Sequence, residues 1–130
     1  METHQEINQL FEKSMDSAGS DPASSYAIAE KLLSTCKQNN DLPGMAKSYL
    51  LLAYSGQFMG LHAQAFENVH LALPIFKESK DYKNEAASYN TLGFIYYYFD
   101  EHEKRLEVNL KSLKIREKIE DTIGYARSLN

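Results

Sequence analysis

The stretch Asp81-Tyr82-Lys83-Asn84-Glu85-Ala86-Ala87-Ser88-Tyr89 has a counterpart forty residues before it and another forty residues after it. The counterparts read Asp41-Leu42-Pro43-Gly44-Met45-Ala46-Lys47-Ser48-Tyr49 and Asp121-Thr122-Ile123-Gly124-Tyr125-Ala126-Arg127-Ser128-Leu129. Three residue types keep the same step in all three copies: Asp41/Asp81/Asp121, Ala46/Ala86/Ala126 and Ser48/Ser88/Ser128. A period of this size is typical of stacked-repeat proteins, whose units bury their apolar faces against their neighbours.

Each forty-residue unit is predicted to consist of two helices. In the third unit we expect helices over 82–99 and about 101–119, and in the second unit over 42–58 and 61–79, because apolar residues recur at helical spacing. Asp41, Asp81 and Asp121 stand where a helix needs an N-cap. Asp100 and Glu103 have the spacing of a capping box for the second helix of the third unit. Pro74 is expected to kink or interrupt its helix.

Residues 1–40 fit the same pattern more loosely. Thr3 and Glu6 form a possible capping box, and Asp21-Pro22 reads as an N-cap followed by proline at the first helical position of a helix over 22–38. The whole chain, 1–130, is therefore predicted to be one repeat domain, with units at about 1–40, 41–80, 81–120 and a partial unit at 121–130. Because half a hairpin cannot cover its own apolar face, we expect an N-terminal fragment of a longer protein, or a neighbouring chain over the exposed end.

The net charge, the cysteine content and the N-terminal residues indicate which partners and which cellular compartment to expect. The net charge of −4, from 14 basic and 18 acidic residues that are interspersed, gives no electrostatic reason to expect nucleic acid or an anionic membrane as a partner. The single cysteine, Cys36, excludes an intrachain disulfide and fits a reducing compartment. The polar N-terminus is unlike a secretory signal, so the cytoplasm is the expected location.

The sequence contains no recognisable catalytic or metal-binding motif. Spacings such as Cys-x-x-Cys, His-x-x-x-His and Gly-x-Ser-x-Gly do not occur, and the six glycines are scattered rather than grouped in a phosphate loop. The repeat-equivalent pair His62 and His102 is expected to pack at the turns between helices, with metal binding as the less favoured alternative. We therefore expect no catalytic residues, no metal, no cofactor and no enzymatic activity for this chain, although a longer parent protein could be an enzyme.

The phrase Tyr89-x-x-Leu92-Gly93-x-x-Tyr96 resembles the tetratricopeptide repeat pattern. Tyr49-x-x-Leu52-Ala53-x-x-Gly56 is a weaker copy, whereas Arg105-x-x-x-Asn109 departs from the small and apolar pair of the second helix. The resemblance covers residues 41–130 well and 1–40 loosely. It implies an all-α fold, a right-handed α-α superhelix or solenoid of about three helical hairpins with a truncated fourth.

The forty-residue unit is similar to the long form of this repeat found in bacterial signalling proteins. In that setting the resemblance implies a non-catalytic, N-terminal regulatory module that precedes a histidine kinase, a nucleotide or diguanylate cyclase, or a transcription regulator. The implied partner is a protein or a peptide. The output domain that follows the module in the same chain is one such partner. The alternative function is homo-oligomerisation, with a homodimer as the simplest form.

In this family the first helices of the hairpins line a concave, partner-binding face. Carried over by position, that face would comprise Lys47, Leu50, Tyr54, Gln57, Phe58, Ala87, Asn90, Phe94, Tyr97, Tyr98, Arg127 and Asn130. This mixture of aromatic, amide and sparse positive side chains favours an extended or helical segment with apolar anchors over a terminal carboxylate. The alternative is that some of these aromatic side chains face a later helix of a longer array.

Overall fold

The computed structural model describes residues 3–128, without the side chains of residues 121 and 124–128. All regular secondary structure in the described residues is helical, as the sequence predicts. The six helices are α1 (His4–Ser17), α2 (Pro22–Gln38), α3 (Leu42–Phe58), α4 (His62–Ser79), α5 (Tyr82–Tyr98) and α6 (His102–Ser128). The predicted helices at 22–38, 42–58, 61–79 and 82–99 are thus confirmed to within one residue at each end.

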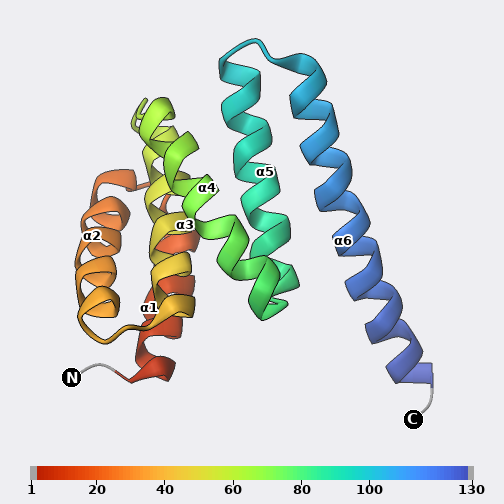
Figure 1. The fold of residues 1–130 in the computed structure, drawn as a ribbon, viewed down its shortest axis with the longest axis horizontal. Coiled ribbons are helices and arrows are strands. Elements are labelled where there is room, and N and C mark those ends of the chain that lie inside the picture. Colours follow the sequence, from red (N-terminus) through yellow and green to blue (C-terminus); the bar gives the residue numbers. More distant parts are fainter. Residues whose placement is uncertain (1–2, 129–130) are drawn as a thin grey trace.

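Each helix packs against the next one in the chain. In addition, α1 contacts α3 and α3 contacts α5, so the odd-numbered helices form a continuous row through the molecule. Figure 1 shows α1 to α3 gathered near the N-terminus and the α5–α6 hairpin at the opposite side, with α4 between them. This arrangement is repeat-like and all-α, because each new helix buries its apolar side against the helices that precede it.

The turns between α2 and α6 repeat every twenty residues. Asn40, Gly60, Lys80 and Asp100 each adopt a positive φ, between 52° and 77°. A left-handed residue at the end of a helix reverses the chain and lets backbone N–H groups bond to the last carbonyl oxygens. In each turn the amide of the residue after the left-handed one donates to the carbonyl five residues before it, as Asp41 N does to Cys36 O at 2.9 Å. Four successive helices therefore end by the same local device.

The recurrence of aspartate at a forty-residue step is explained by helix capping. The Asp41 and Asp81 carboxylates accept hydrogen bonds from the Gly44 and Asn84 backbone amides at 3.0 and 3.3 Å. Asp21 does the same for the Ser24 amide of α2, with Pro22 in the first turn. Each carboxylate satisfies an amide that has no partner within its helix and lies at the positive end of the helix dipole. The predicted N-caps at these three positions are confirmed.

The predicted capping by Asp100 and Asp121 is wrong. Asp100 occupies the left-handed turn position, and its carboxylate lies 3.3 Å from His102 Nε2; the N-cap position falls to Glu101, whose carbonyl accepts from the Arg105 amide at 2.9 Å. The helix α6 continues without a break through residue 121 to Ser128. No helix therefore begins at Asp121. The helix propensity of the residues on both sides outweighs the preference of aspartate for a capping position.

Pro74 lies inside α4, which remains helical on both sides of it. The ribbon of α4 changes direction partway along its length (Figure 1), as expected where proline removes one backbone donor and its ring crowds the preceding turn. The expected kink is therefore present, and the expected interruption is not.

Two clusters of buried side chains form the interior. The first joins α1, α2, α3 and the end of α4 around Phe11, Leu50 and Phe76. The second joins α3, α4, α5 and α6 around Val69, Leu92 and Ile95. Since α3 and α4 contribute to both clusters, they connect the two ends of the molecule.

Replacing Asp81 with alanine is expected to lower the free energy of unfolding by about 1 kcal/mol, because the first turn of α5 loses its capping acceptor. The matched control is Glu101→Ala at the equivalent position of α6, where the carboxylate lies 3.9 Å from Lys104 Nζ in a solvent-exposed pair. Such pairs contribute only tenths of a kcal/mol. Urea denaturation of both variants checks the difference, and an equal loss in the two would contradict the capping role of Asp81.

Candidate functional site

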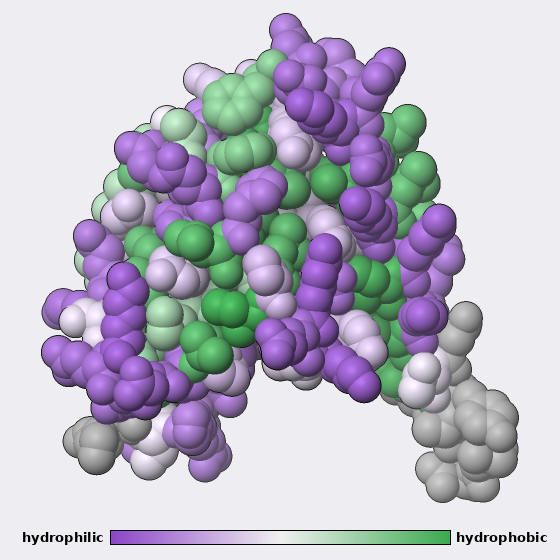
Figure 2. All heavy atoms as spheres, in the orientation of Figure 1, coloured by the Kyte–Doolittle hydropathy of each residue, from purple (hydrophilic) through white to green (hydrophobic). Residues whose placement is uncertain are grey.

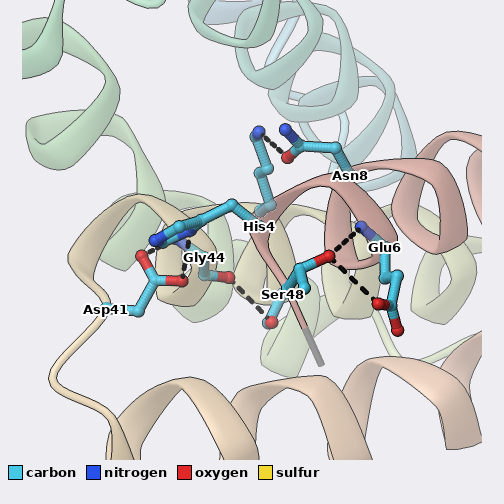
Figure 3. A network of polar contacts seen from close by, with 8 residues as sticks. His4, Glu6, Asn8, Asp41, Gly44 and Ser48 are labelled. Atoms are coloured by element: carbon cyan, nitrogen blue, oxygen red, sulfur yellow. Dashed lines mark hydrogen bonds and ion pairs between the residues drawn. The ribbon is translucent and has the colours of Figure 1, made fainter. Parts of the chain in front are cut away.

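Polar contacts fasten the first turn of α1 to the start of α3 (Figure 3). His4 Nδ1 lies 3.5 Å from the Asp41 carboxylate, and Asn8 of α1 accepts a hydrogen bond from Lys47 of α3. Ser48 Oγ donates to the Gly44 carbonyl at 2.8 Å and turns its polar atom back into its own helix. The contacts of His4 and Asn8, together with the buried side chains of Ile7 and Phe11, hold α1 along α3. The predicted face of α3 is thereby partly covered by α1.

The predicted partner-binding residues of α3 fall into three environments. Leu50 is fully buried and belongs to the core, and Gln57 is also buried, so neither presents a surface to a partner. Lys47 is half-buried and bonded to Asn8. Tyr54 is half-buried, and its ring meets the exposed ring of Phe58 edge-on, with centroids 5.3 Å apart. Of the five residues, Tyr54 and Phe58 keep an open aromatic surface.

On α5 the predicted residues do not all share one face. Ala87 is half-buried beside the first core cluster, whereas Asn90 and Phe94 are exposed. Tyr97 is exposed, with the Arg105 guanidinium 5.4 Å from its ring centroid. Tyr98 instead stacks on His62 at the start of α4, with centroids 3.5 Å apart. The Tyr98 side chain is therefore directed toward α4, since consecutive residues of a helix point about 100° apart.

A hollow of about 330 Å³ lies where α1, α3, α5 and α6 converge. Its apolar surface comes from Phe11, Met15, Tyr54, Ala87 and Ile119. The odd-numbered helices supply most of this lining, and α6 closes one side. Figure 2 shows hydrophobic residues in the middle of one face of the molecule.

Charged side chains stand around the hollow with the two signs on opposite sides. Glu12 and Asp16 come from α1, whereas Lys83 and Arg116 come from α5 and α6. Lys83 Nζ and Glu12 Oε1 approach to 3.4 Å and bridge the two sides. Since this pair is exposed, it contributes little stability and can open at small cost. The Arg116 Nε donates to Ser112 Oγ at 3.3 Å, which directs the guanidinium along α6.

Two residues that the resemblance assigned to the concave face, Tyr54 and Ala87, line this hollow, whereas its charged residues were not among those predicted. Glu12 and Asp16 belong to α1, whose register in the repeat could not be assigned from the loose pattern of residues 1–40. Arg116 and Ile119 belong to a second helix, and only the packing of α6 across α5 brings them to the same place. The i, i+4 spacing of Glu12 and Asp16 is a signal that they share one side of a helix.

Two predicted residues cannot be placed on this face. Arg127 lies in the last turns of α6 rather than at the start of a further row of helices, and its side chain is not described. Asn130 lies outside the described residues.

Neither a metal-binding cluster nor a polar role for His62 is found in the described part of the chain. Among the described residues, no three histidine, cysteine or acidic side chains come close enough together to hold a metal ion. His62 is buried, packs between Tyr98 and Phe99, and its Nδ1 has no hydrogen-bond partner within the described part of the chain. Its ring thus serves as an aromatic packing group at the turn.

Comparisons with protein-family models, with curated proteins and with solved structures found no match to this chain. Within residues 3–128, none of the helices combines the length and the hydropathy needed to cross a lipid bilayer.

Proposed function

We propose that this chain is a non-catalytic interaction module that binds a peptide or protein segment in the hollow between α1, α3, α5 and α6. The observation that carries the proposal is the composition of that hollow. Apolar and aromatic side chains line it, acidic residues stand on the α1 side and basic residues stand on the α5–α6 side. Interaction sites commonly combine a central apolar anchor with a charged periphery that selects and orients the partner.

The lining specifies the kind of segment that fits. One apolar side chain of the partner inserts beside Phe11 and Tyr54, which offer aromatic surface. A basic residue of the partner then faces Glu12 and Asp16, and an acidic residue faces Arg116. Such a segment replaces the exposed ion pair between Glu12 and Lys83 with contacts of its own, at little cost to the fold.

The resemblance to tetratricopeptide repeats extends the proposal to the architecture of the chain and to the kind of protein it belongs to. The confirmed forty-residue alternation of helices and the row formed by α1, α3 and α5 support a solenoid of helical hairpins that winds as a superhelix. On the same resemblance, we assign the module to a cytoplasmic bacterial signalling protein in which it regulates an output domain. The partner segment then belongs either to a separate protein or to that output domain.

Selection from a displayed library of random peptides, followed by affinity measurement on the purified chain, tests the site. We expect enriched peptides to carry an apolar residue next to a basic one, and Tyr54→Ala to weaken their binding by about tenfold or more. The reversal Glu12→Lys with Asp16→Lys is expected to weaken those peptides and to favour acidic ones in a repeated selection.

Leu71→Ala is the matched control, because Leu71 is exposed on α4 and is not part of the hollow. Circular dichroism confirms that each variant keeps its helices. If no peptide is enriched, or if Tyr54→Ala and Leu71→Ala bind the enriched peptides equally well, the hollow is not the binding site.

A further inference from the structure

The helix α6 carries a stripe of exposed leucines on the side away from α5. Val108 and Ser112 are buried against the hairpin partner, whereas Leu106, Leu110 and Leu113 are exposed at i, i+4 and i+7. These three positions form one face of a helix. Three large apolar side chains in a row on one helix are more than the scattered exposure found on ordinary protein surfaces.

The repeat itself shows that this stripe is an interface position. Forty residues earlier the same positions are Phe66, His70 and Leu73 on α4, where α5 packs over Phe66 and Leu73 while His70 stays exposed. The Phe66 and Tyr96 ring centroids are 5.8 Å apart, and Leu73 lies in the core cluster with residues of α5. Leu73 is 7% exposed, but its equivalent Leu113 is 51% exposed, since no helix among the described residues covers it. The stripe has the chemistry of a surface that receives a helix.

The charges beside the stripe identify that helix. Glu103 and Glu107 occupy one flank in the first half of the stripe, and Lys114 and Lys118 occupy the same flank in the second half. At 100° per residue, all four fall within a 60° sector next to the leucines. An antiparallel copy of α6 brings this flank against the same flank of the second helix and sets Glu107 opposite Lys114 and Glu103 opposite Lys118. In a parallel copy the flank would face the other side of the second helix, and these four charges would not meet one another.

We propose that two copies of this chain form a two-fold symmetric dimer through an antiparallel pairing of their α6 helices. The leucines at 106, 110 and 113 interleave in the centre. The four flanking charges of each copy form four ion pairs across the contact, related in twos by the symmetry axis near Leu110. An isologous contact of this kind requires a self-complementary surface, which this arrangement of charges provides. Glu107 also lies 3.5 Å from Lys111 of its own helix, but that exposed pair is weak and leaves the carboxylate free to accept from the second copy.

The dimer is expected to be weak, because the stripe is only seven residues long and small interfaces bind transiently. Light scattering coupled to gel filtration, and sedimentation velocity, over a range of protein concentrations, should give a dissociation constant on the order of tens of micromolar. The double substitution Leu110→Gln with Leu113→Gln is expected to raise that constant by about tenfold or more. Leu71→Gln, an equally exposed leucine on α4, should leave it unchanged.

A charge-exchange series tests the antiparallel geometry. Lys114→Glu and Glu107→Lys should each weaken the dimer about threefold to tenfold, and the two together in one chain should restore it, because the pairs form again with the signs exchanged. All variants change exposed residues, so circular dichroism and thermal melting should match those of the unmodified chain. A monomer at every concentration, a dimer that survives the Leu110→Gln and Leu113→Gln substitutions, or a charge-exchanged double variant no stronger than the singles would each overturn the proposal.

Discussion

Replacing Phe76 with alanine is expected to lower the free energy of unfolding by about 3–5 kcal/mol. Phe76 is 1% exposed near the end of α4 and is part of the cluster that joins α1, α2 and α3 to that helix. Truncation removes the transfer free energy of the ring and leaves a cavity that the four surrounding helices cannot fill without moving. Since a domain is stable by only about 5–15 kcal/mol, this loss consumes a large share of the total.

Urea denaturation followed by circular dichroism measures the effect of Phe76→Ala. The matched control is Phe94→Ala on α5, where the ring is 48% exposed and its removal is expected to change stability by less than about 1 kcal/mol. A Phe76→Ala variant that unfolds at the same urea concentration as Phe94→Ala would show that the cluster around α4 does not hold the N-terminal helices together.

The substitution Gly44→Ala is expected to lower the free energy of unfolding by about 1–3 kcal/mol, although alanine is the better helix former. A Cβ at this position would lie 2.5 Å from Cys36 Sγ and 2.5 Å from a carboxylate oxygen of Asp41. Cys36 is fully buried, so its sulfur cannot move into solvent. Asp41 would have to rotate away and would lose its hydrogen bond to the Gly44 amide, which caps α3.

Gly93→Ala, in the first helix of the next repeat unit, is the matched control. A Cβ there would approach Asn109 Oδ1 to 2.3 Å, but Asn109 is exposed on α6 and its side chain can turn outward. The equivalent position forty residues earlier is Ala53, which is accommodated. We therefore expect Gly93→Ala to leave stability unchanged or to raise it slightly through helix propensity. Thermal melting of the two variants checks the contrast, and the expectation fails if Gly44→Ala melts no lower than Gly93→Ala.

The helices and most of their ends could be predicted because their causes are local. Asp21, Asp41 and Asp81 cap helices with hydrogen bonds to amides three residues away, which spacing alone reveals. The errors at Asp100 and Asp121 have the same origin: an aspartate is a good cap only where the chain already turns. At Asp121 the surrounding residues continue α6, and at Asp100 the turn itself needs a left-handed residue.

The candidate site could be predicted only in part. The resemblance to tetratricopeptide repeats singles out Tyr54 and Ala87, but Glu12 and Arg116 come from helices that reach the hollow through packing. Leu50 illustrates the opposite error, since its position in the repeat predicts an open surface while α1 and its neighbours bury it completely. Burial at a repeat position depends on which helix lies over it, and the repeat pattern does not contain that information.

The amino-acid sequence by itself determined the all-α class, the forty-residue step and the capped starts of α2, α3 and α5, since these depend on interactions within a few residues of each other. Only the tertiary structure decided that Leu73 is covered while Leu113 is not, and that acidic and basic side chains from three helices meet around one hollow. Those features arise from contacts between residues far apart in the chain, whose geometry is set by how whole helices pack.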